Sequence, residues 1–83
     1  MHELFAKLEE IIRWLDLMAS SFQFKRDQID EDKQRISTEL GGGASGIDTQ
    51  LIGLLDQARS KYGDAIGTLN MAKQYLEIKK NSL

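Results

Sequence analysis

The chain has no cysteine and no proline, and it has a single histidine. Without thiols it can form neither a disulfide nor a thiolate–metal staple. Without proline, no residue forces an internal helix break. His2 stands at a terminus, where helices fray, which argues against a role for it in metal binding or acid–base catalysis. Any internal break must therefore come from glycine.

Long apolar runs and an excess of charge of one sign are also missing. No uncharged run reaches the roughly 18 residues that a membrane span needs. The net charge is -2, from 11 basic and 13 acidic residues that are well mixed, so the basic stripe of a nucleic-acid binder is absent. Glu3, Lys7, Glu9 and Glu10 interrupt any apolar core of a cleavable signal peptide. We expect a protein that stays in the cytoplasm or leaves it by a route that needs no such signal.

No catalytic constellation is visible in the sequence. Ser20 and Ser21 have no neighbouring base to activate them. The central glycines lack the Lys-Ser/Thr pair of a phosphate loop. The acidic residues within 27–32 lack the glycine and the ligand pattern of a calcium loop, and they alternate with basic residues as on an exposed helix face. We predict no enzymatic activity, no metal and no cofactor.

What the sequence does have is a cluster of glycines at its midpoint. Each glycine inside a helix costs about 1 kcal/mol relative to alanine, so three in succession end a helix. Gly41 can take the left-handed conformation that closes a helix, and Ser45 can cap the next one with Asp48 in a capping-box-like position. The predicted turn contains Leu40, Gly41, Gly42, Gly43 and Gly46. The sequence thus predicts a helix over about 3–40, a turn over 41–46 and a helix over about 47–80.

Both arms carry a seven-residue apolar repeat with the paired 3-4 spacing of a coiled-coil seam. The columns of the first arm are Leu8, Leu15, Phe22, Ile29 and Ile36, and Leu4, Ile11 and Met18. Those of the second arm are Leu55, Tyr62, Leu69, Leu76 and Leu83, and Leu51, Ala58, Ala65 and Ala72. The predicted hairpin seam consists of Ile29, Ile36, Leu51, Leu55, Ala58, Tyr62, Ala65, Leu69, Ala72 and Leu76.

Folding the chain at its midpoint sets large residues against small ones. Phe22 comes opposite Ala65, and Leu15 comes opposite Ala72, which is the interdigitation that close packing requires. The connection is too short for a parallel arrangement. We predict an all-α fold: one domain over 1–83, an antiparallel two-helix hairpin with a central glycine turn. A chain this small without staples buries little core, so we expect a four-helix dimer or a larger helical assembly.

The first half of the first arm has more apolar surface than one helix can cover. Apolar residues wrap most of its circumference, and such a helix must be covered on several sides. Trp14, Leu17 and Phe24 have no evident partner within the hairpin. The predicted partner interface consists of Leu4, Phe5, Leu8, Ile11, Ile12, Trp14, Leu15, Leu17, Met18, Phe22 and Phe24.

Gly53, Gly63 and Gly67 are unexpected inside the second arm. They are either weak spots that tertiary contacts tolerate or part of a second helix-packing face. Ile52 and Ile66 lie on the flank of Gly63 and Gly67, which fits the second interpretation. The sequence leaves both readings open.

The layout resembles the Esx family, the small W-x-G helical hairpins of type VII secretion, with the shorter relatives that accompany LXG toxins. Leu40-Gly41-Gly42 stands where the W-x-G motif would stand, but the only tryptophan is Trp14. Tyr75 is followed four positions later by Lys79, where the family's secretion signal has an acid. The residues whose small-and-large spacing is similar are Gly46, Leu51, Leu55, Ala58, Tyr62, Ala65, Leu69 and Ala72. The resemblance implies a four-helix dimer in which this chain is the partner without the signal.

Three functions remain open at this level. The first is a non-enzymatic interaction module, an adaptor or chaperone-like partner in a secretion system. It would pair as a homodimer or heterodimer with another helical hairpin or with a helical segment of a larger protein. The second is a structural protomer of a needle, rod or filament. The third is a membrane-active hairpin, which is disfavoured because Glu9, Glu10 and Asp16 outnumber the basic residues nearby.

Overall fold

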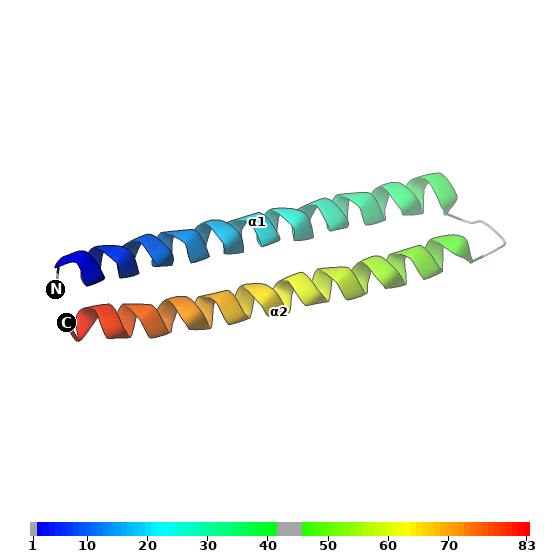
Figure 1. Cartoon of the computed structure of the whole chain (residues 1–83). Coiled ribbons are helices and arrows are strands. Elements are labelled where there is room, and N and C mark those ends of the chain that lie inside the picture. The colour runs from blue at the N-terminus through cyan, green and yellow to red at the C-terminus, as the bar shows by residue number, and fades with distance from the viewer. Residues whose placement is uncertain (1, 42–45) are drawn as a thin grey trace.

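The computed structural model describes residues 2–41 and 46–83, and Gly42, Gly43 and Ser45 of the predicted turn lie outside this range. Two helices, α1 (His2–Leu40) and α2 (Ile47–Asn81), lie side by side and antiparallel (Figure 1). The predicted all-α hairpin is confirmed. Compared with the predicted ranges, α1 begins one residue earlier and α2 ends one residue later.

The hairpin is long and thin. Its Cα atoms extend over 64 × 14 × 11 Å with a radius of gyration of 18.8 Å. A compact domain of the same length has a radius of gyration of about 12 Å. The beginning of α1 and the end of α2 lie at one end of the molecule, and the end of α1 and the beginning of α2 lie at the other (Figure 1). Every residue of such a two-helix layer is near the surface, so little of the chain can be fully buried.

The two glycines that frame the turn serve different purposes. At Gly41 an added Cβ atom would lie 2.0 Å from the carbonyl oxygen of Ser37, so only glycine fits where α1 ends. The left-handed glycine is Gly46 rather than Gly41: among the described residues Gly46 alone has a positive φ, 71°. Gly46 is the N-cap of α2, and its carbonyl accepts a hydrogen bond from the backbone nitrogen of Gln50 at 3.1 Å. Asp48 lies in the first turn, where its charge complements the helix dipole.

One predicted column of α1 lies in the seam between the helices, and the other does not. Leu8, Leu15, Phe22, Ile29 and Ile36 are buried or half-buried. They are joined by Ile12, Ala19, Arg26 and Lys33, the column one residue after the predicted Ile11 and Met18. Ile12 and Ile29 are the most buried of the described side chains, at 8% and 9% exposed. The prediction that the Leu4–Ile11–Met18 column lies in the seam was wrong. In the half of α1 near the turn, Arg26 and Lys33 reach across to α2, and this sets the rotation of the helix.

The seam of α2 differs from the prediction in the same way. Leu55, Tyr62, Leu69 and Leu76 are half-buried as predicted, but their companions are Ile52, Arg59, Ile66 and Lys73. Ala58 and Ala65 are half-buried beside this seam, whereas Leu51 and Ala72 are exposed. The ring of Phe22 packs at 5.4 Å, between centroids, on Tyr62, one helical turn before the expected Ala65.

Three ion pairs join the helices across the seam. The Nε atom of Arg59 donates to Asp30 at 2.8 Å, Lys33 pairs with Asp56, and Nζ of Lys73 donates to Asp16 at 2.9 Å. The first two are reciprocal, since each helix supplies one acid and one base three residues apart. The hydrogen bond and charge of Asp16 raise the pKa of Lys73 above its ordinary value.

Candidate protein-interaction face

The ion pairs identify one edge of the hairpin. Asp16, Asp30 and Asp56 each follow a seam position by four residues, so all three lie on the same side of the seam. Helix positions three and four apart continue this side along both helices. We call it the polar face, and it comprises Ala6, Glu9, Arg13, Asp16, Ser20, Gln23, Asp27, Asp30, Gln34 and Ser37 of α1, with Thr49, Gly53, Asp56, Ser60, Gly63, Gly67, Asn70, Gln74, Glu77 and Asn81 of α2.

The polar face contains no large apolar side chain among the described residues. Its glycines do not pack other parts of the chain closely: a Cβ atom at Gly53 or Gly67 would meet nothing within 4 Å. At Gly63 a Cβ atom would lie 3.3 Å from Cζ of Arg26. Gly53 and Gly67 are therefore open positions on a solvated face within this chain, and only Gly63 accommodates a neighbour.

The opposite side of the seam is apolar, and we call it the apolar face. Its large members are exposed to very different degrees, from 37% for Ile11 to 55% for Trp14 and 61% for Leu54. The face repeats a second 3-4 spacing, parallel to the seam, along both helices. It comprises Leu4, Ile11, Trp14 and Met18 of α1, with Ile47, Leu51, Leu54, Ala58, Ala65, Ala72 and Tyr75 of α2.

Further apolar side chains extend this surface around the outer edges of both helices. Leu17 is 69% and Met71 is 71% exposed, and Phe24 and Ile78 are exposed to a similar extent. Phe5, at the chain-end limit of the seam column of Ile12, also remains exposed, with the Lys80 ammonium 5.6 Å from its ring centroid. The apolar surface is therefore densest in the half of the hairpin that carries the chain ends.

The predicted partner interface divides into two groups. Leu8, Ile12, Leu15 and Phe22 lie in the seam and contribute to the hairpin itself. The exposed group consists of Leu4, Phe5, Ile11, Trp14, Leu17, Met18 and Phe24. Sequence reasoning missed the contribution of α2, namely Ile47, Leu54, Met71, Tyr75 and Ile78. The spacing of Ile47, Leu51, Leu54 and Ala58 was the signal that could have found it.

Charge is distributed unequally between the two faces. The apolar face carries Lys7, Lys25, Lys61 and Lys79, all exposed, and the Lys79 ammonium lies 5.4 Å from the ring centroid of Tyr75. Its acidic members, Asp32 and Glu39, are confined to the half near the turn. The polar face instead holds Glu9, Asp16, Asp27, Asp30, Asp56 and Glu77 against the single base Arg13. Seam bases pair with Asp16, Asp30 and Asp56, so the polar face keeps a smaller excess of negative charge, while lysines predominate on the apolar face.

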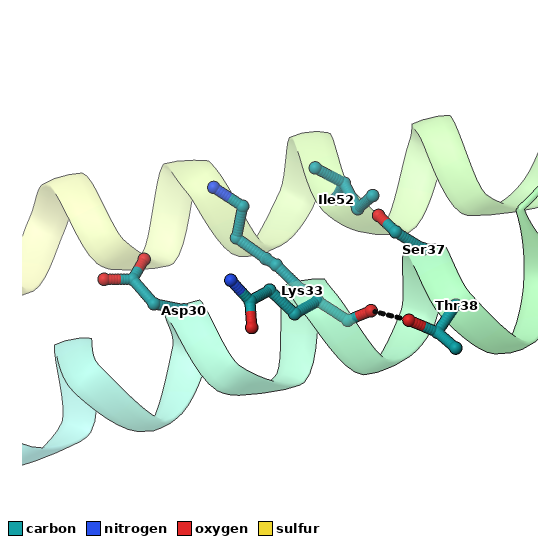
Figure 2. A pocket seen from close by; sticks show the side chains of 6 residues that line it. Asp30, Lys33, Ser37, Thr38 and Ile52 are labelled. Carbon is teal, nitrogen blue, oxygen red and sulfur yellow. Dashed lines mark hydrogen bonds between the residues drawn. The ribbon is translucent and has the colours of Figure 1, made fainter.

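A shallow groove of about 680 Å³ lies between the helices near the turn (Figure 2). Lys33 extends across it from α1 towards α2, where it pairs with Asp56. The hydroxyl of Thr38 donates to the carbonyl of Gln34 at 2.9 Å. None of the residues that line the groove pairs a nucleophile with a base.

Within residues 2–41 and 46–83, no group of acidic or histidine side chains converges in the way that a metal ion requires. Neither described helix has an apolar stretch of the length and purity needed to cross a bilayer. A comparison of the chain with known families, curated proteins and solved structures finds no match. The geometry of the apolar face is therefore the main guide to function.

Proposed function

We propose that the protein is a non-enzymatic interaction module whose apolar face is covered by the helices of a partner. The observation that carries the proposal is the exposure of Trp14, Leu17, Leu54 and Tyr75 on a hairpin that buries only Ile12 and Ile29 among its described residues. Full burial of such side chains contributes about 1.5–3 kcal/mol each. In the monomer these four side chains stay 55–69% exposed, so more than half of that free energy is not gained.

The surface area supports the same proposal. The hairpin exposes 6253 Å² for a mass of 9.4 kDa. A compact monomer of this mass exposes about 5,000 Å². A stable interface removes about 800 Å² from each partner, so one helical partner accounts for most of the excess. A second two-helix layer on the apolar face gives a four-helix bundle, the usual way for such a layer to gain a core.

The resemblance to the Esx hairpins suggests the setting, an adaptor or chaperone-like role in a secretion system. The degenerate motif at Leu40-Gly41-Gly42 supports that role, and the lack of an acid four residues after Tyr75 suits the signal-free partner. In this setting the protein acts in the cytoplasm or after export without a cleavable signal. The second candidate is a structural protomer. Leu17 and Met71 are exposed on the outer edges, and side-by-side growth of copies would bury these edges as well as the apolar face.

Light scattering across a concentration series, with and without vesicles, tests these functions. A discrete assembly supports the module, and open-ended growth supports the structural protomer. A folded monomer that binds lipid supports a membrane-active hairpin instead. A folded monomer that binds neither lipid nor a protein partner would contradict the proposal.

A matched pair of variants locates the surface. Trp14→Glu with Leu54→Glu adds two charges to the apolar face, and Ser20→Glu with Ser60→Glu adds the same charges to the polar face. The first pair should abolish association while helix content by circular dichroism stays close to that of the wild type. Equal association of both variants would show that the apolar face is not the binding surface.

A further inference from the structure

We infer that the occupant of the apolar face is an amphipathic helical segment of a different protein, with acidic residues flanking its apolar stripe. The inference rests on the proposed function and adds the chemistry of the partner. Its basis is charge: outside the segment next to the turn, the charged side chains of this face are Lys7 and Lys79 near the chain ends and Lys25 and Lys61 near the middle of the hairpin. Glu10 and Asp64 lie beyond it, on the outer edges.

The four lysines stand within the columns of the apolar face. Lys7 and Lys61 share the outer columns of Trp14 and Leu54, and Lys25 and Lys79 share the inner columns of Met18 and Ala72. Each lysine is exposed, and no described ion pair joins any of them to a carboxylate. A partner helix packed along these columns would bring its own flanking residues close to Lys7 and Lys61 and would cross near Lys25 and Lys79. Complementary charges at the rim of an interface select partners and raise the association rate. Asp and Glu at those flanking positions are the matching chemistry.

Charge repulsion disfavours a homodimer in which the two apolar faces are stacked and the chain ends of both copies lie at the same end. The contact between Phe5 and Lys80 sets Lys7 at the level of Lys79 and Lys80. The contact between Phe22 and Tyr62 sets Lys25 at the level of Lys61. Since α1 of one copy would lie over α2 of the other at the same level, lysine would face lysine at both places, and like charges in register are unfavourable.

In a homodimer whose copies point in opposite directions, apolar side chains would lie against charged ones. Ile11, Trp14 and Met18 would lie over the charged half of the other α1, where Asp32 and Arg35 hold the same face. A shifted stacking that pairs only the terminal halves leaves Leu51 and Leu54 uncovered. Neither arrangement gives a self-complementary surface, which an isologous dimer requires.

The shape of the apolar face favours a helix, rather than a lipid surface, as its binding partner. Ala58, Ala65 and Ala72 form a column of small side chains at seven-residue spacing on α2. Large exposed side chains surround this column. They are Trp14 on α1, 55% exposed, and Leu54 and Tyr75 on α2, 61% and 60% exposed. Ridges of side chains on a neighbouring helix pack into grooves of this kind. A bilayer offers no ridge to fill such a groove.

Two synthetic helical peptides test the inference on the intact protein. Both carry the same apolar heptads over about 28 residues, well above the length at which isolated helices are marginal. One has Glu and the other Lys at every flanking position. Trp14 is the sole tryptophan, so its emission reports binding directly. We expect the Glu peptide to bind about tenfold more tightly in low salt and the gap to narrow as salt screens exposed charges.

Charge reversal on α1 supplies the control. Lys25→Glu should reduce the preference for the Glu peptide, whereas Arg13→Glu, the same charge change on the polar face, should leave it unaltered. Equal affinity for both peptides would overturn the inference while leaving the apolar face a protein-binding surface. A blue shift of Trp14 with anionic vesicles but with neither peptide would assign the face to membranes. A tight homodimer that the Glu peptide does not displace would assign it to a second copy.

Discussion

The guanidinium of Arg26 on α1 lies against the backbone of Gly63 on α2, at a point where an alanine Cβ would stand 3.3 Å from Cζ. Among the described residues, no group accepts a hydrogen bond from the buried Nε of Arg26. The absence of a side chain at Gly63 makes room for the arginine inside the seam. Gly63 is thus the one interior glycine of α2 whose neighbour explains it.

Alanine substitutions at two glycines measure this contact. Gly67→Ala should stabilise the hairpin by up to about 1 kcal/mol, because alanine favours the helix and the added Cβ meets nothing. Gly63→Ala should gain less, since the flexible end of Arg26 must shift by a few tenths of an ångström. Urea denaturation gives both free energies of unfolding. Equal gains at the two positions would show that Arg26 does not occupy the space above Gly63.

Neighbouring isoleucines test the rotation of α1. Ile12 is 8% exposed in the seam and Ile11 is 37% exposed on the apolar face. Ile12→Ala should cost about 2–3 kcal/mol, near the lower end for buried isoleucines, because the two-helix layer can partly collapse. Ile11→Ala should cost less than about 1 kcal/mol in the unpartnered hairpin. The reverse order in thermal or urea unfolding would mean that the seam follows the Leu4–Ile11–Met18 column.

The reciprocal ion pairs should be measurable by a double-mutant cycle. Asp30→Arg alone places two guanidinium groups together at Arg59, and Arg59→Asp alone places two carboxylates together. The double exchange should recover most of the lost stability, with a coupling of about 0.5–1 kcal/mol for a pair this exposed. The coupling should shrink as salt is added. Additive losses without recovery would exclude direct pairing of these residues.

Alkaline pH should release the ion pair nearest the chain ends. The pKa of Lys73 lies above its ordinary 10.5 because Asp16 accepts its hydrogen bond and attracts its charge. The contribution of this pair is therefore complete below the ordinary lysine pKa and is lost as the pH rises through the raised value in the folded protein. The wild type should lose more stability over that range than Lys73→Met does. Parallel pH profiles of the two proteins would argue against the pair.

The helices and their pairing could be predicted from sequence because they rest on local signals. The glycine cluster around Gly41 sets the fold-back, and the column from Leu8 to Ile36 identifies one row of the seam. The rotation of each helix about that row could not be read from apolar spacing alone. The columns of Ile11 and Ile12 are equally apolar, and the choice depends on Arg26 and Lys33 reaching carboxylates on the other helix.

The exposed apolar surface was only half predictable for the same reason. Trp14 and Leu17 were evident because too many apolar residues crowd one arm. Leu54 and Tyr75 were not, because the large residues of α2 are diluted by alanines along the same face. The side on which Asp16 lies was equally hidden in the sequence, and its ion pair with Lys73 places it on the polar face.

The separation of charge between the two faces gives the molecule an electric dipole moment across its thin direction, perpendicular to the helices. The helix dipoles contribute little to this moment, because they point along the axes of α1 and α2. In the field of an acidic partner, the hairpin experiences a torque that turns Lys25 and Lys61 forward before contact. A larger share of collisions then begins with the correct face presented, so association is faster without any additional contact in the final complex.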